Sequence, residues 1–143
     1  MSDTMHASWE HFEHQADIGV RGYGATLESA FEQAGLALVA VMVPLERIAQ
    51  VIRVEVRCEA PDCELLLVDW LNSILREMSI RKMVFSRFRV SIQGRQLTGE
   101  LWGEAMDSPR HEPSVEVKAA TYHTLKVWQE LQGRWGAQCV VDV

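Results

Sequence analysis

The stretch "QVIRVEVRCEA" (residues 50–60) decides the fold, because it shows the strictest alternation of side-chain type in the chain. Ile52, Val54, Val56 and Cys58 alternate with Arg53, Glu55 and Arg57. Successive side chains of a β-strand point to opposite faces of its sheet. The stretch therefore predicts a strand with one face buried and the other in water.

The residues that follow this strand predict a helix and then a hairpin. Asp62 can N-cap a helix over residues 62 to about 79. Its buried stripe is Leu67, Leu71, Ile74, Leu75 and Met78, with Asn72, Arg76 and Glu77 towards water. Residues 84–105 then predict two strands around a tight turn at Gln93-Gly94-Arg95. Residues 50–106 thus form one strand-helix-strand-strand module.

The flanking residues predict a second module of the same kind. Short strands are expected at 9–14 and 17–23, and Thr26 can N-cap a helix that Pro44 ends. Residues 120–143 supply two more strands. The prediction is an α+β fold in which one strand-helix-strand-strand module is inserted in the other. We expect mixed or antiparallel sheets with helices packed on one face. Residues 9–143 form a single domain after a disordered tail at 1–8.

Composition narrows the classes of function. The 143 residues include 14 Lys and Arg against 20 Asp and Glu, for a formal net charge of −6. This balance disfavours direct nucleic-acid binding, and the basic cluster in "SIRKMVFSRFRV" is expected to be a solvated strand face. No stretch resembles a membrane span or a signal peptide, so the cytoplasm is the expected location. Cys58 and Cys139 are expected in the core.

The nested topology suggests a pair of carboxylates. Asp17 and Asp142 become plausible neighbours when residue 17 and the last strand share a sheet. With the terminal carboxylate of Val143 they form a set of hard oxygen donors that suits Mg²⁺, Mn²⁺ or Ca²⁺, and His14 could add an imidazole. The alternative is that Asp17 belongs to an ordinary turn and Asp142 is an exposed penultimate residue.

Other polar residues allow two interpretations each. Lys118 is either a charge partner for the acids or a residue that protects an edge strand. Glu104 could support the acidic site, but it could equally be a cross-strand partner. His111 is expected in a solvated loop, and His123 is expected to be a half-buried strand residue. Trp70 and Trp102 are expected in the core.

Five separated segments resemble, in order, the signature segments of the archease family. They are "EHQADIGVRGYGATLESAFEQAGLAL" (13–38), "LLLVDWLNSIL" (65–75), "GE" (103–104), "EVKAATYHTLKV" (116–127) and "VVDV" (140–143). The resemblance covers residues 10 to 143. One departure is that Gln15 stands where the family's first motif has threonine.

The resemblance implies a fold with the same nested modules, and it implies a function. Archeases are protein cofactors of the RtcB-type RNA ligase, which joins 2′,3′-cyclic-phosphate or 3′-phosphate ends to 5′-hydroxyl ends using GTP and Mn²⁺. The cofactor speeds guanylylation of the ligase and supports multiple turnover. By the motifs, Asp17, Asp142 and Val143 would be the metal ligands. His14 would adjoin them, and Lys118 would be a functional charged residue nearby.

Two rival functions predict different behaviour. A stand-alone metal-dependent phosphoesterase would use Asp17, Asp142 and His14 for hydrolysis, although the sequence offers no clear nucleophile or general base. A chaperone-like interaction module would need no metal. The first rival predicts phosphate-ester hydrolysis by the chain alone, and the second predicts no binding of Mn²⁺ or Ca²⁺.

Overall fold

The computed structural model of the chain describes residues 6–143. In chain order the elements are β1 (Ser8–His14), β2 (Asp17–Gly24), α1 (Leu27–Met42), the 3₁₀ turn η2 (Leu45–Arg47), β3 (Ile52–Glu59), α2 (Cys63–Arg81), β4 (Met83–Gln93), β5 (Gln96–Ala105), α3 (Ser108–His111), β6 (Ala119–Ala120), β7 (Lys126–Gln129) and β8 (Trp135–Asp142). Of the tail expected at residues 1–8, residues 1–5 lie outside the described part, and Ser8 already begins β1.

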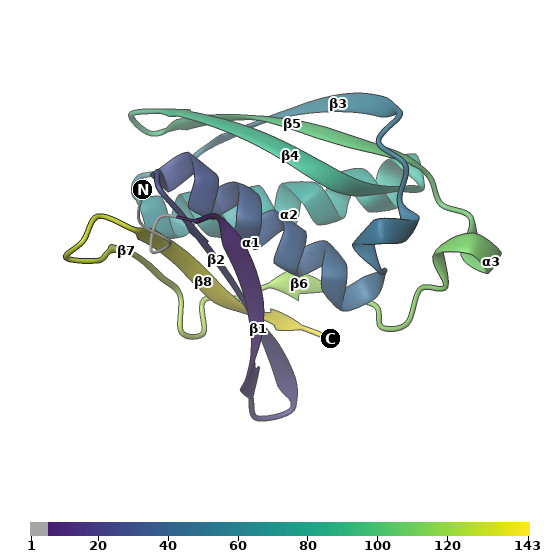
Figure 1. The fold of residues 1–143 in the computed structure, drawn as a ribbon, viewed down its shortest axis with the longest axis horizontal. Helices are drawn as coiled ribbons and strands as arrows, with labels where there is room; N and C mark the ends of the chain where they lie inside the picture. The colour runs from purple at the N-terminus through teal and green to yellow at the C-terminus, as the bar shows by residue number, and fades with distance from the viewer. Residues whose placement is uncertain (1–5) are drawn as a thin grey trace.

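The long helices α1 and α2 lie between two sheets (Figure 1). The smaller sheet has the order β3-β5-β4, and the larger one has the order β1-β2-β8-β6, with β7 also paired to β8. Every pairing in both sheets is antiparallel. Each sheet therefore has helices packed against one face only, and the α+β prediction is confirmed in its antiparallel form.

The strand orders reveal two copies of one arrangement. In the module of residues 52–105, the first strand β3 pairs with the last strand β5, and β4 lies beyond it. In the outer module, β2 pairs with β8, and β7 lies along the other edge of β8. The predicted nesting is present because the first module interrupts the second between α1 and β6.

Local signals set the helix boundaries. The Thr26 hydroxyl accepts a hydrogen bond from the Ser29 amide at 3.0 Å, and the Asp62 carboxylate accepts one from the Leu65 amide at 2.9 Å. Helix α2 runs to Arg81, two residues beyond the expected end. It ends there because Lys82 adopts a left-handed conformation (φ 54°) and donates its amide hydrogen to the Met78 carbonyl.

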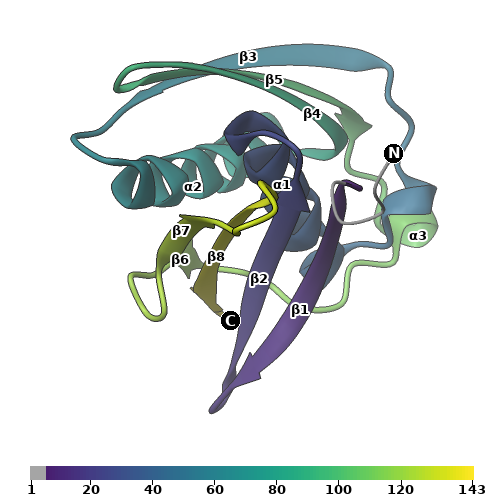
Figure 2. The ribbon, with the colours of Figure 1, turned by 60° about the vertical axis from the view of Figure 1, so that its left-hand side comes forward.

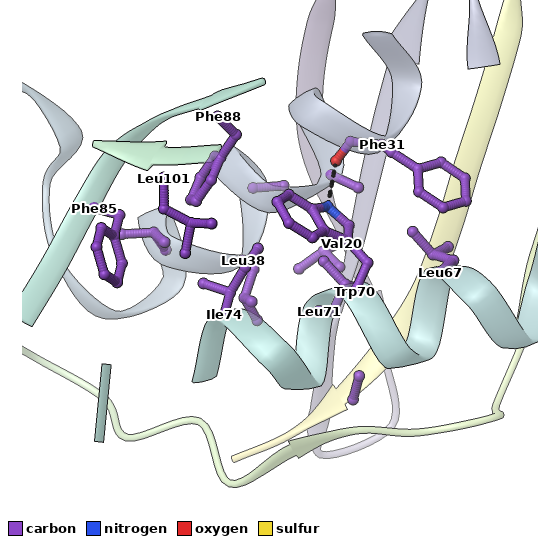
Figure 3. Close-up of a cluster of buried hydrophobic side chains, with 14 of the residues drawn as sticks. Val20, Phe31, Leu38, Leu67, Trp70, Leu71, Ile74, Phe85, Phe88 and Leu101 are labelled. Atoms are coloured by element: carbon purple, nitrogen blue, oxygen red, sulfur yellow. Dashed lines mark hydrogen bonds between the residues drawn. The ribbon is translucent and has the colours of Figure 1, made fainter. Parts of the chain in front are cut away.

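The core fills the space between the layers (Figure 3). Trp70 is fully buried, and its Nε1 donates a hydrogen bond of 2.9 Å to the Phe31 carbonyl on α1. Cys139 is also fully buried, and this burial raises the pKa of its thiol to about 12. Cys58 is only half-buried, at the edge of the core.

Four side-chain placements differ from the prediction. His123 was expected half-buried in a strand, but it is exposed in the turn between β6 and β7. Trp102 lies half-buried on the outer face of β5, where the Arg87 guanidinium stands 4.3 Å above its ring. His111 belongs to the short helix α3 and is completely buried. Asn72 points towards the larger sheet rather than water, and its Oδ1 accepts a hydrogen bond of 2.9 Å from the Ala120 amide.

Both long helices carry charged side chains, among them Glu28 and Glu32 on α1 and Arg76 and Glu77 on α2. Within residues 6–143, no helix combines the length and the apolar character that a membrane crossing requires.

Candidate metal site

The two candidate aspartates lie at neighbouring strand ends of the larger sheet. Ile18 of β2 pairs with Val141 of β8, and Asp17 and Asp142 are the next residues along these two strands. Figure 2 shows the C-terminal end of β8 running beside β2. Asp142 is exposed and Asp17 is half-buried. Their meeting at one end of the sheet is a consequence of the nesting, which brings β2 and β8 together.

A pair of histidine rings stands next to Asp17. His14 faces Asp17 across the β1–β2 hairpin, and its Nδ1 is buried without a hydrogen-bond partner among the described residues. The His123 ring stacks on the His14 ring, with centroids 5.9 Å apart. The His123 carbonyl accepts a hydrogen bond from the Val140 amide at 3.1 Å, which ties this segment to β8. Sequence reasoning did not associate His123 with the site, because only the tertiary fold brings it to β1.

Lys118 is joined to the same strand end through its backbone. Its amide donates a hydrogen bond of 2.8 Å to the Asp142 carbonyl, and the next residue, Ala119, pairs with Asp142. Lys118 is exposed, and the residue also lines a hollow next to Asn72 and Arg76 of helix α2. Lys118 is therefore a backbone neighbour of Asp142.

The possible metal ligands at this strand end do not form a complete coordination shell among the described residues. Val143 follows β8 and packs half-buried against the core. In the described part of the chain, no three side chains of His, Cys, Asp or Glu converge closely enough to hold a metal ion. Asp17 and Asp142 could supply two carboxylates, and the other positions around a cation would need main-chain oxygens, water or groups from a partner.

Glu104 does not lie at this site. It is on β5 of the smaller sheet, where the Arg110 guanidinium donates two hydrogen bonds of 2.7 and 2.8 Å to its carboxylate. The Ala49 amide donates another at 2.8 Å. These donors, Arg110 first, hold the pKa of Glu104 well below its ordinary range. Glu104 therefore serves as the charged anchor of helix α3.

The buried His111 completes this anchor. The Asp107 amide donates to His111 Nδ1 at 2.9 Å, so the ring proton is on Nε2, which lies 2.8 Å from Glu104. The neutral imidazole can thus donate to the carboxylate without an unpaired buried nitrogen. The sequence gives no sign of the contact between His111 and Glu104, because the stretch around His111 is typical of a solvated loop.

Gln15 forms the turn between His14 and Asp17 with a left-handed backbone (φ 55°). A β-branched side chain is strongly disfavoured in this conformation. We expect Gln15→Thr, which restores the family's residue, to lower the free energy of unfolding by about 1 kcal/mol. Gln15→Gly should be at least as stable as the parent chain. Urea denaturation of the parent and both variants measures this, and equal stability of Gln15→Thr and Gln15→Gly would contradict it.

Asp17 and Asp142 together form an acidic strand end of the larger sheet. This feature and the fold define a class of small α+β proteins built from two nested sheet modules. The Archease protein family (MTH1598/TM1083) matches residues 9–143 of the chain. The chain therefore belongs to the archease family.

Individual relatives cover nearly the whole chain. Protein archease from Pyrococcus furiosus is 44% identical over 139 residues, which span 94% of this chain and 98% of that protein. Protein archease from Methanosarcina mazei is 38% identical over 141 residues, spanning 94% and 95%. The solution structure of Methanobacterium thermoautotrophicum protein 1598 has the same fold, with a TM-score of 0.84 and 33% identity. The structural match covers 95% of this chain and 99% of the chain in that solution structure.

Proposed function

We propose that this chain is a protein cofactor that activates an RtcB-type RNA ligase. It would promote the GTP- and metal-dependent guanylylation of the ligase and its multiple turnover. The observation that carries the proposal is the position of Asp17 and Asp142 at adjoining strand ends in a member of the archease family. The chain itself would be no enzyme, because the ligase performs the chemistry.

The proposed cation would be held by the carboxylates of Asp17, Asp142 and the main-chain carboxylate of Val143. Such hard oxygen donors suit Mn²⁺, Mg²⁺ or Ca²⁺. The buried and unpartnered Nδ1 of His14 supports a polar ligand beside Asp17, because such an atom is costly to leave unsatisfied. An open set of ligands suits delivery, since a cation that keeps several waters can exchange them for groups of the ligase.

The charge of the chain supports a protein partner rather than RNA. A net charge of −6 repels phosphates, whereas a carboxylate pair at a strand end can approach a metal-dependent active site. We therefore expect the chain to act in the cytoplasm with its ligase, and to have little affinity for RNA by itself.

The proposal is tested by measuring guanylylation of the ligase from the same organism, with GTP and Mn²⁺, in the presence and absence of this protein. We expect faster guanylylation and several rounds of RNA joining only when the protein is present. No acceleration would contradict the proposal. Hydrolysis of a phosphate ester by the chain alone would instead support the phosphoesterase.

A further inference from the structure

Two polar side chains of helix α2 hold backbone amides at one edge of the larger sheet. The strands β6 and β7 form this edge, and both pair with β8. The Glu64 carboxylate accepts a hydrogen bond of 3.2 Å from the Val127 amide on β7. Asn72 Oδ1 accepts one of 2.9 Å from the Ala120 amide on β6. The helix thus satisfies edge amides that would otherwise be left without a strand partner.

Strand β6 depends on Asn72 more than an ordinary strand would depend on one side chain. It consists of Ala119 and Ala120 alone, which pair with Asp142 and Val141 of β8. Such a ladder is much shorter than the usual strand of about 5–6 residues. On its other side, β6 is tied to the helix by the hydrogen bond from Ala120 to Asn72. Asn72 therefore fixes the place of β6 between α2 and β8.

The backbone of Asp142 is in turn held by β6 rather than by β2. The register between β2 and β8 ends at the pair Ile18–Val141. One residue further along β8, Ala119 pairs with Asp142, and the Lys118 amide donates a hydrogen bond of 2.8 Å to the Asp142 carbonyl. Asp142 is also the last residue of β8. A displacement of β6 therefore moves the backbone of Asp142 directly.

We propose that Asn72 is a positioning residue for the candidate metal site. By holding β6 it fixes the backbone of Asp142, and thereby the place of the Asp142 carboxylate at the acidic strand end. The metal role of Asp142 rests on the proposed function. The path from Asn72 to Asp142 rests on the contacts alone, namely two hydrogen bonds and one strand pair. Asn72 itself does not need to touch the cation.

The test compares the full chain with Asn72→Ala, which removes the acceptor, and Asn72→Asp, which keeps an oxygen acceptor. We expect Asn72→Ala to weaken Mn²⁺ binding about tenfold in a calorimetric titration, since residues that orient metal ligands have effects of this size. Hydrogen exchange followed by NMR should become faster at the Lys118 and Thr121 amides, which donate to β8. Asn72→Asp should restore most of the affinity. It should also restore slow exchange, which separates the hydrogen bond from the added charge.

The matched control is Glu64→Ala. This variant removes the same kind of contact from the same helix, but β7 pairs with residues 135–138 of β8 rather than with Asp142. Exchange should become faster at the Val127 amide, and Mn²⁺ binding should stay unchanged. Equal losses of Mn²⁺ affinity in Glu64→Ala and Asn72→Ala would overturn the inference, and so would parent-like affinity in Asn72→Ala.

Ligase stimulation separates this inference from the proposed function. Asn72→Ala should stimulate less than the parent chain at low Mn²⁺ and should recover at saturating Mn²⁺, because its carboxylates are all present. Asp142→Asn should not recover. Stimulation by Asn72→Ala that stays low at saturating Mn²⁺ would contradict a positioning role. A parent chain that neither binds Mn²⁺ nor stimulates the ligase would contradict the proposed function itself.

Discussion

Trp70→Ala is expected to lower the free energy of unfolding by about 3–5 kcal/mol, the range for removing a large buried aromatic side chain. The ring is fully buried between the sheets, and the Phe88 ring meets it edge-on with centroids 5.7 Å apart. The variant also loses the hydrogen bond to the Phe31 carbonyl, which links the two helices. Urea denaturation followed by circular dichroism measures the change.

Two further variants separate the contributions to this effect. Trp70→Phe keeps an aromatic ring but loses the indole donor and some volume, so its cost should be clearly smaller than that of alanine. Trp102→Ala removes the same side chain from the outer face of β5, where it is half-buried, and should cost about 1 kcal/mol or less. A larger loss for Trp102→Ala than for Trp70→Ala would contradict the layered core.

The modules were predictable because their signals are local. The alternation along β3 and the N-caps Thr26 and Asp62 each act within a few residues. The hairpin turn at Gly94 likewise needs a positive φ, here 61°, which glycine adopts without strain. Such features depend on a few neighbouring residues, and tertiary contacts did not override them.

The placement of Trp102 was not predictable from residue type alone. In β5 the inward positions are Leu97, Gly99, Leu101 and Gly103, so the alternation of the strand places Trp102 on the outward face. The need for glycine at position 99 lies elsewhere in the chain. A Cβ at Gly99 would come within 2.3 Å of the Trp70 ring, which occupies that space. The contact between His111 and Glu104 joins residues only seven positions apart, but the residue types in this loop do not reveal it.

The acidic strand end was predictable only through topology. Residues 17 and 142 are 125 positions apart (142 − 17), and no spacing rule connects them. They become neighbours because β2 and β8 pair in the larger sheet, as β3 and β5 do in the smaller one. The histidine pair and the amide of Asn72 were missed for the same reason, since each depends on a contact between distant segments.

Asp142→Asn and Asp17→Asn are each expected to abolish stimulation of the ligase and to weaken Mn²⁺ binding at least about tenfold. Asparagine keeps the shape of the side chain and removes only its charge. Because Asp142 is exposed at a strand end, its replacement should change the free energy of unfolding by no more than about 0.5 kcal/mol. Ligase guanylylation, Mn²⁺ titration and urea denaturation of each variant measure the three effects.

The matched control is Glu59→Gln, which neutralises an exposed carboxylate at the end of β3 in the smaller sheet. This change lowers the net negative charge by the same amount, so a loss of stimulation common to all three variants would mean that overall charge is responsible. Stimulation retained by Asp142→Asn would contradict the metal site directly. Loss of stimulation with unchanged Mn²⁺ binding would place Asp17 and Asp142 at the contact with the ligase instead. The carboxylates are therefore tested as ligands and as contact residues in one set of proteins.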